Sequence, residues 1–256
     1  MNSGPTKDLA RVFDRVADAY DAGRPSYPDE MYRAVIELSG VDLDGATTVD
    51  IGAGTGILTR ALRARGSHVI AVDPGAGMLT RLMSRSGSGT PAVAAVQGDG
   101  NALPLGDGVA DLVTYAQSWH WLDPVVSISE ARRVLRRRGA IVGCWNLNHA
   151  AQADWLAAYE ARLAAEVPAY WGPAVEQWSV PPIASAFEVI EERWIPWTRL
   201  IGIEDFLLDL RSHSYMAALS PEAADALVER RRAELREEFP EGVLSVPMRV
   251  YLAVGR

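Results

Sequence analysis

The chain has 256 residues, of which 48% are hydrophobic and 23% charged, enough for one large α/β domain with an inserted cap. Its formal net charge of −8 argues against nucleic acid as a partner, because neutralising phosphates requires clustered cations. A single cysteine, Cys144, excludes an internal disulfide. The sequence shows neither a secretory signal nor an apolar run of ~20 residues, so we expect a cytoplasmic protein with no membrane partner.

The N-terminal part contains two helical patterns. Residues 8–21 repeat apolar side chains at helical spacing, and a second amphipathic stretch runs from Asp29 to about Ser39. Tyr20 and Arg24 lie near the turn between them. An arginine fork suits a carboxylate ligand, but Arg24 could equally cap a helix and Tyr20 could pack in the core.

The most informative stretch is residues 48–56, an apolar run that ends in Gly52, Gly54 and Gly56 and passes directly into a helical pattern. Glycines allow positive φ and close approach of a ligand, and the following helix start offers unpaired N–H groups. The pattern therefore predicts a site for a nucleotide-like cofactor. The third glycine comes one residue too early for a dinucleotide motif, and Asp50 precedes the first by two positions.

Acids follow at the ends of the next two predicted strands. Residues 68–73 form a short buried strand that ends in Asp73, close to the ~20 residues after the glycines at which an acid binds ribose hydroxyls. A third strand, 92–97, leads to Asp99, and a fourth spans 110–116. A single aspartate at a strand end can also be only a helix cap. The prediction of a cofactor site therefore depends on the glycine turn, Asp73 and Asp99 occurring together.

Taken together, these motifs resemble the class I S-adenosylmethionine-dependent methyltransferases. The matching segments are the Gly-x-Gly-x-Gly turn, Asp73-Pro-Gly-Ala-Gly-Met-Leu and Gly98-Asp-Gly-Asn-Ala-Leu-Pro-Leu. The Arg24-Pro-Ser-Tyr-Pro segment is similar to that of small-molecule enzymes of the UbiE/trans-aconitate-like methyltransferase group. The resemblance implies a Rossmann-like α/β fold: a seven-stranded, mostly parallel sheet with an antiparallel C-terminal end and a helical cap.

The resemblance also implies S-adenosyl-L-methionine as cofactor and assigns residues to it. Arg24 is expected near the methionine carboxylate, Asp73 on the ribose and Asp99 on the adenine amino group. The full expected set is Tyr20, Arg24, Asp50, Gly52, Gly54, Gly56, Asp73, Pro74, Met78, Asp99, Gly100, Asn101 and Gln117. Residues 1–40 would form a helical lid, 41–147 the cofactor-binding core, and 148–256 a substrate cap plus the C-terminal strands.

The acceptor is expected beyond the carboxyl ends of the fourth and fifth strands, where ligands of open α/β sheets bind. Tryptophans near these ends and in residues 168–182 favour a flat, apolar or aromatic small molecule. The expected set is Trp119, His120, Trp121, Trp145, Asn146, Tyr170, Trp171 and Trp178. His120 is the first candidate for a general base titrating near neutral pH, with Tyr20 a weaker one; His120 could instead only shape the wall.

The later elements are expected as a helix from Pro124, capped by Asp123, through the arginines to Arg138, and a fifth strand over 140–146. Further along we expect helices over 150–167, 203–212 and 220–239, and strands over 187–198 and 243–254. No metal-ligand spacing is visible.

Methyl transfer to a small molecule, at oxygen, nitrogen or carbon, is the function these features favour, with natural-product biosynthesis as one context. Two alternatives stay open. A protein of this fold could bind the same cofactor for another purpose. A nicotinamide oxidoreductase shares the fold but fits neither the glycine spacing nor Asp99. The oligomeric state is not indicated.

Overall fold

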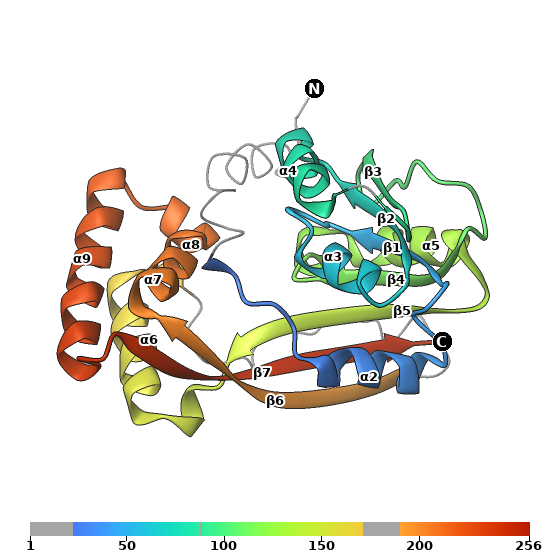
Figure 1. Ribbon diagram of the computed structural model, residues 1–256. Coiled ribbons are helices and arrows are strands. Elements are labelled where there is room, and N and C mark those ends of the chain that lie inside the picture. The colour runs from blue at the N-terminus through green and yellow to red at the C-terminus, as the bar shows by residue number, and fades with distance from the viewer. Residues whose placement is uncertain (1–22, 88, 171–189) are drawn as a thin grey trace.

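The computed structural model describes residues 23–87, 89–170 and 190–256 (Figure 1). The expected site residues Tyr20, Trp171 and Trp178 therefore lie outside the described residues. One seven-stranded sheet organises the rest, in the order β3-β2-β1-β4-β5-β7-β6. This is the α/β fold class that the sequence predicts, with a parallel half and an antiparallel end.

The parallel half consists of β1 (Thr47–Ile51), β2 (His68–Asp73), β3 (Val93–Gln97) and β4 (Ala110–Ala116). The helices α3 (Ile57–Arg63) and α4 (Ala76–Ser86) follow β1 and β2, and α5 (Pro124–Val134) follows β4. The apolar side chains of α5 pack on one face of the sheet, those of α3 and α4 on the other. With both faces covered, β1 and β4 are buried over nearly their whole length, as parallel strands are, and in β1 this includes the polar Thr48 and Asp50.

The antiparallel end is built from the three longest strands, β5 (Leu135–Asn148), β6 (Ile190–Gly202) and β7 (Val243–Gly255). β5 is parallel to β4, and β7 lies between β5 and β6, antiparallel to both. These strands run on beyond the parallel half and connect it to a separate group of helices (Figure 1).

That group is the cap, formed by α6 (Asp154–Glu166), α7 (Ile203–Arg211), α8 (Ser214–Ala217) and α9 (Pro221–Glu238). It has its own apolar core, to which the far end of β7 contributes Leu244, Val246 and Met248. The cap and the parallel half stand at opposite ends of β5 and β7 (Figure 1).

The helix α2 (Asp29–Ser39) does not take part in the lid expected over residues 1–40, and residues 1–22 of that lid lie outside the described residues. The helix packs through Met31, Tyr32, Val35 and Leu38 against β5, β6 and β7, so it covers the sheet and does not overlie the strand ends. Its amphipathic pattern predicted a helix correctly. The pattern does not determine what covers the apolar face, and in the structure the sheet covers it. Residues 29–40 therefore belong to the core.

The helix α5 corrects a second expectation, because it ends at Val134 and not at Arg138. From Leu135 the chain is extended and pairs with β4, Leu135 opposite Ala110 and Ala140 opposite Leu112, with an irregularity between them. The N-terminal boundary is as predicted: Asp123 accepts hydrogen bonds from the N–H groups of Val125 and Val126, and Pro124 opens the helix.

Candidate cofactor and acceptor site

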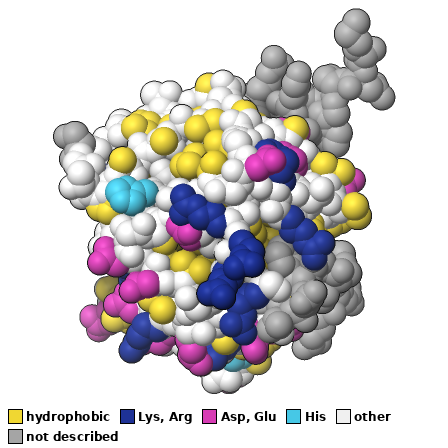
Figure 2. Space-filling model, turned by 90° about the vertical axis from the view of Figure 1, so that its right-hand side faces the viewer, with side chains coloured by type: hydrophobic (Ala, Val, Ile, Leu, Met, Phe, Trp, Pro, Cys, Tyr) yellow, Lys and Arg dark blue, Asp and Glu magenta, His cyan; other side chains and the backbone are white. Residues whose placement is uncertain are grey.

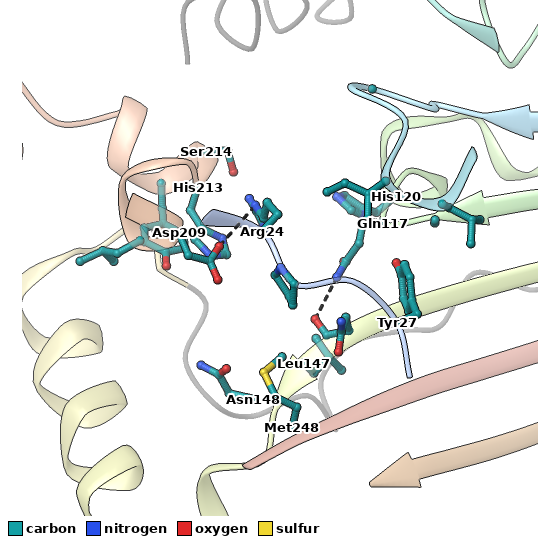
Figure 3. Close-up of a pocket in the computed structure, with 18 of the residues that line it drawn as sticks. Arg24, Tyr27, Gln117, His120, Leu147, Asn148, Asp209, His213, Ser214 and Met248 are labelled. Carbon is teal, nitrogen blue, oxygen red and sulfur yellow. Dashed lines mark hydrogen bonds and ion pairs between the residues drawn. The ribbon is translucent and has the colours of Figure 1, made fainter. Parts of the chain in front are cut away.

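A cavity of about 270 Å³ lies between the cap and the carboxyl ends of the parallel strands (Figure 3). Its wall on the sheet side is the glycine turn with Gln117, His120 and Trp121. Its wall on the cap side comes from α6, α7 and Tyr170, and the segment Arg24–Tyr27 runs along it. Of the expected residues, the cavity thus brings together Arg24, Asp50, Gly52, Gly54, Gln117, His120, Trp121, Asn146 and Tyr170.

The glycine turn has the conformation that the sequence predicts. Gly54 has φ 55°, and a side chain built on it would meet no atom within 4 Å, so its backbone faces open space. Gly56, with φ 87°, is the N-cap of α3, and a side chain there would collide with Leu82. The turn therefore fits a ligand that approaches main-chain N–H groups closely.

Asp50 lies on β1, two residues before the glycine turn, and forms buried hydrogen bonds to the elements around it. Its carboxylate is 1% exposed and accepts hydrogen bonds from the hydroxyls of Thr59 at 2.6 Å and Thr114 at 2.9 Å. Burial raises the pKa of Asp50 to about 6, against the lowering effect of the two hydroxyls. Because Thr114 is on β4 and Thr59 on α3, Asp50 joins three elements at the base of the site.

Asp73 joins the ends of β1 and β2. Its Oδ2 accepts from the Gly54 N–H at 2.9 Å and its Oδ1 from the Gly75 N–H at 2.8 Å. Pro74 accepts from the Gln97 side chain, and Met78 is buried. Asp73, Pro74 and Met78 do not line the cavity but lie at the strand ends next to it, so a ribose contact by Asp73 stays a prediction.

Asp99, Gly100 and Asn101 form a turn after β3. Asp99 accepts from the Asn101 N–H at 2.8 Å, and the Asn101 amide oxygen accepts from the N–H of Asp123 at 3.0 Å. A side chain at Gly100 would lie 2.7 Å from Ile51, so the glycine is required by packing as well. These residues, too, lie beyond the cavity, and their role toward an adenine stays a prediction.

At the end of β4, Gln117 and His120 face the cavity. Gln117 has φ 59° and donates from its side chain to the Asn146 carbonyl at 2.9 Å. Desolvation by nearby protein atoms, with a smaller effect from Arg24, lowers the pKa of His120 to about 4, although the residue as a whole is exposed. This shift disfavours His120 as a general base near neutral pH, and its role toward the acceptor stays a prediction.

Trp119 and Trp145 are corrections to the expected acceptor wall. Both are 1% exposed, and neither lines the cavity. The Trp119 ring packs edge-on against Tyr115 with centroids 4.4 Å apart, in the core beneath α5. Trp145 and Asn146 are consecutive on β5 and so point to opposite faces, which leaves only Asn146 at the cavity. Trp121, by contrast, lines the cavity and is 36% exposed.

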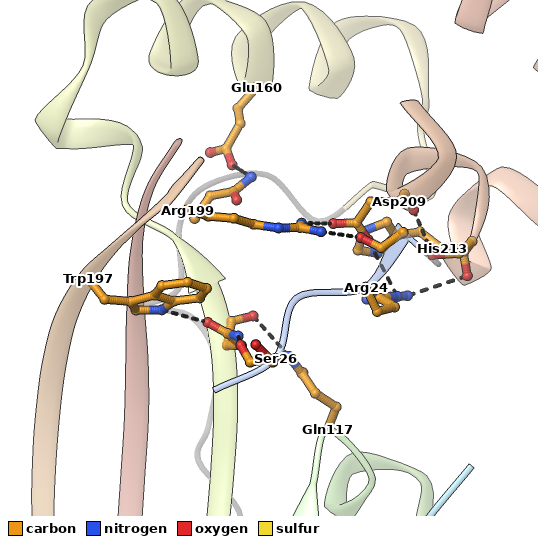
Figure 4. Close-up of polar contacts among 12 residues, drawn as sticks. Arg24, Ser26, Gln117, Glu160, Trp197, Arg199, Asp209 and His213 are labelled. Atoms are coloured by element: carbon orange, nitrogen blue, oxygen red, sulfur yellow. Dashed lines mark hydrogen bonds and ion pairs between the residues drawn. The ribbon is translucent and has the colours of Figure 1, made fainter. Parts of the chain in front are cut away.

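The Asn146 side chain on β5 forms hydrogen bonds to Ser26 and Trp197, which are both labelled in Figure 4. It donates to the Ser26 carbonyl at 2.9 Å and accepts from the Trp197 indole N–H at 3.1 Å. The chain after Arg24 is thereby attached to β5 and β6.

The Arg24 guanidinium lies at the C-terminal end of α7 (Figure 4). It donates to the Ser212 carbonyl at 3.4 Å and lies 3.6 Å from Asp209. Asp209 also pairs with Arg199 at 2.9 Å and approaches His213 at 3.6 Å. The geometry matches the helix-capping alternative, while Arg24 also lines the cavity.

Sequence reasoning missed the polar groups of the cap-side wall: Asp209, His213 and Glu160. Burial lowers the pKa of His213 well below its usual value and raises that of Glu160. The only available signal was Leu210-Arg-Ser-His-Ser-Tyr215, which carries His213 but neither carboxylate.

Three general properties bear on the expected partners. In the described ranges, no cluster of three His, Cys, Asp or Glu residues is placed to hold a metal ion. None of the helices in the described part of the chain is long and apolar enough to cross a bilayer. On the face drawn in Figure 2, Lys and Arg side chains gather toward the middle with acidic side chains close by.

Comparison with known proteins agrees with this geometry. Residues 49–143 match the family described as a methyltransferase domain. An uncharacterized methyltransferase of Mycobacterium tuberculosis is 35% identical over 140 residues, 55% of this chain and 54% of that protein. A demethylmenaquinone methyltransferase of Clavibacter sepedonicus is 32% identical over 140 residues, 53% of this chain and 57% of that protein. The chain spans about half the length of the curated relatives it matches.

Solved structures share the fold over most of the chain. A candidate Type II methyltransferase from Anaeromyxobacter dehalogenans has a TM-score of 0.68 at 21% identity, covering 91% of this chain and 97% of that one. Phosphoethanolamine N-methyltransferase 2 of Haemonchus contortus, solved with S-adenosyl-L-methionine, has a TM-score of 0.56 at 18% identity, covering 99% of this chain and 60% of that one. Residues 49–143 thus match a methyltransferase domain, and the chain that carries them has the Rossmann-like methyltransferase fold that its sequence predicts.

Proposed function

We propose that the protein transfers a methyl group from S-adenosyl-L-methionine to a small molecule with an apolar or aromatic body. One observation carries the proposal: a single cavity extends from the glycine turn to an aromatic wall of the cap. The cavity would take the methyl-bearing end of the cofactor at the glycine turn and part of a second small molecule at the cap, with the nucleoside of the cofactor outside it, at the ends of β2 and β3.

The residues present fit the cofactor. Gly54 leaves open space above its backbone, and Asp73 holds the turn in place. When bound, the cofactor would supply an electrophilic methyl carbon on a positively charged sulfur, and the electron pair of the acceptor would displace the thioether in line. The chain then has to align the acceptor and exclude water, from which most of the acceleration in such displacements comes.

His120 and Trp121 line the cavity just after β4, and we assign the alignment of the acceptor to them. A neutral imidazole accepts or donates a hydrogen bond without a charge that would repel the sulfonium. Its low pKa makes it a poor general base at pH 7, since proton transfer is most efficient when the pKa is near the working pH. We assign His120 to positioning, and any acceptor proton leaves to solvent.

The test has two steps. Calorimetric titration should give micromolar binding of S-adenosyl-L-methionine and its demethylated product, and negligible binding of NAD; tighter NAD binding would overturn the assignment. Methyl-labelled cofactor incubated with protein and a small-molecule extract should then give labelled product. Binding without transfer would favour a cofactor-binding protein of another function.

The acceptor is not fixed by the relatives, because the names of the matched proteins include a demethylmenaquinone and a phosphoethanolamine methyltransferase. The chemical class of the acceptor therefore has to be inferred from the residues that line the cavity.

A further inference from the structure

Glu160 is a buried carboxylate on the cavity wall without a cationic partner in the described chain. It is 4% exposed and lies on α6. Its Oε1 accepts from the Asn148 amide at 2.8 Å, and the Tyr170 hydroxyl donates to the same carboxylate. Both partners are neutral. An ionised Glu160 would therefore have hydrogen-bond donors but no cation beside it to neutralise its charge.

The neighbouring carboxylates, unlike Glu160, form ion pairs with arginines. Asp209, on the same cavity, has Arg24 and Arg199 beside it, and Glu166, two turns further along α6, pairs with Arg230 and Arg231. Arg249 acts on Glu160 only at longer range, and its guanidinium lies over the Trp194 ring, 4.4 Å from the centroid. Burying a carboxylate costs free energy unless a cation or enough hydrogen bonds compensate it.

Aromatic rings surround this end of the cavity. Tyr159, Tyr170, Tyr215 and Phe206 all line it, Tyr170 edge-on to Tyr215 at 5.1 Å and Tyr159 edge-on to Phe206 at 5.3 Å. The faces of such rings attract cations, most strongly where water is excluded. A carboxylate set among aromatic rings is a suitable environment for an organic ammonium group.

We infer that the cap end of the cavity binds an ammonium group of the methyl acceptor, with Glu160 as its counter-ion and the tyrosines around it. The inference deepens the proposed function and rests on it, in that the occupant is the acceptor. An anionic acceptor would be repelled by Glu160, and a neutral one would leave its charge uncompensated. The ammonium group is an anchor; the methylated atom lies toward the glycine turn.

The first test uses the unmodified protein and three probes of one shape: 2-phenylethylamine, 2-phenylethanol and phenylacetate. Calorimetric titration near pH 7, with the demethylated cofactor product present, should give at least ~10-fold tighter binding of the amine than of the alcohol, and no binding of the carboxylate. Equal affinities for amine and alcohol, or a preference for phenylacetate, would overturn the inference.

The second test uses Glu160→Gln, which keeps the hydrogen bond to Asn148 and removes the charge. The control is Asp154→Asn, which removes an exposed carboxylate from the same helix outside the cavity. The preference for the amine should disappear in Glu160→Gln and persist in Asp154→Asn. Its persistence in both variants contradicts the assignment to Glu160.

Cofactor affinity, measured in the same samples, separates this inference from the proposed function. If the cofactor does not bind the unmodified protein, the proposed function fails, while probe selectivity still reports on Glu160. If Glu160→Gln does not fold, the three-probe series on the unmodified protein decides alone.

Discussion

Asp73 and Gly54 are joined by a hydrogen bond of 2.9 Å from the glycine N–H to the carboxylate. The bond connects the end of β2 to the turn after β1, and the other carboxylate oxygen holds the N–H of Gly75. A single side chain thus shapes the turn and stands where a ribose is expected.

Replacing Asp73 with Ala should weaken S-adenosyl-L-methionine binding by about 1–3 kcal/mol, because two backbone donors lose their acceptor and the turn loosens. Isothermal calorimetry measures the change. Asp42→Ala, which removes an exposed aspartate that accepts from a nearby N–H, is the control and should leave the affinity as it is. An unchanged affinity in Asp73→Ala would restrict Asp73 to a capping role.

Asp50 should make the protein less stable as the pH rises. Its pKa is about 6 when folded and 3.8 ordinarily, so the folded state binds the proton more tightly between these values. Its contribution to the free energy of unfolding therefore falls by about 3 kcal/mol as the pH rises from about 4 to 6.

Other carboxylates titrate in the same range, so the comparison is with Asp50→Asn. This variant keeps acceptor and donor atoms toward the two threonines without a charge. Urea unfolding should show it gaining stability relative to the unmodified protein on going from about pH 4 to pH 7. A constant difference over that range would mean that Asp50 does not titrate there.

His120 should remain neutral well below pH 6. Its proton resonances, assigned by their loss in His120→Gln, should shift with a midpoint near 4 in the folded protein and at a higher pH in urea. Methyl transfer by His120→Gln should stay within about tenfold of the unmodified turnover number, whereas loss of a general base costs about 10²–10⁴. A loss in that larger range, with an acid limb that vanishes, would restore His120 as the base.

Asn146→Ala should lower the free energy of unfolding by about 1–3 kcal/mol, because the Ser26 carbonyl and the Trp197 indole N–H lose their partner. A double-mutant cycle with Trp197→Phe isolates the second contact. Strictly additive effects would show that the Asn146–Trp197 hydrogen bond contributes nothing.

The sequence by itself determined the parallel half and its turns. Residues 48–56, Asp73 and Asp99 depend on neighbours close in the chain: an apolar run makes a buried strand, glycines permit the turn, and an acid follows the strand end. Helix starts such as Asp123-Pro124 are equally local, and the sequence predicts them correctly.

Only the tertiary structure decided which side chains meet at the cavity. Trp119 and Trp145 turn into the core while Trp121 and Asn146 face the cavity, because this depends on the faces of β5 and of the short helical turn after β4. Glu160, Asp209 and His213 reach the same space from α6, from α7 and from the start of α8, since β5, β6 and β7 extend far enough to carry the cap. The lowered pKa of His120 arises from the protein atoms around it and from Arg24, which is distant in the sequence, so no short stretch of sequence contains it.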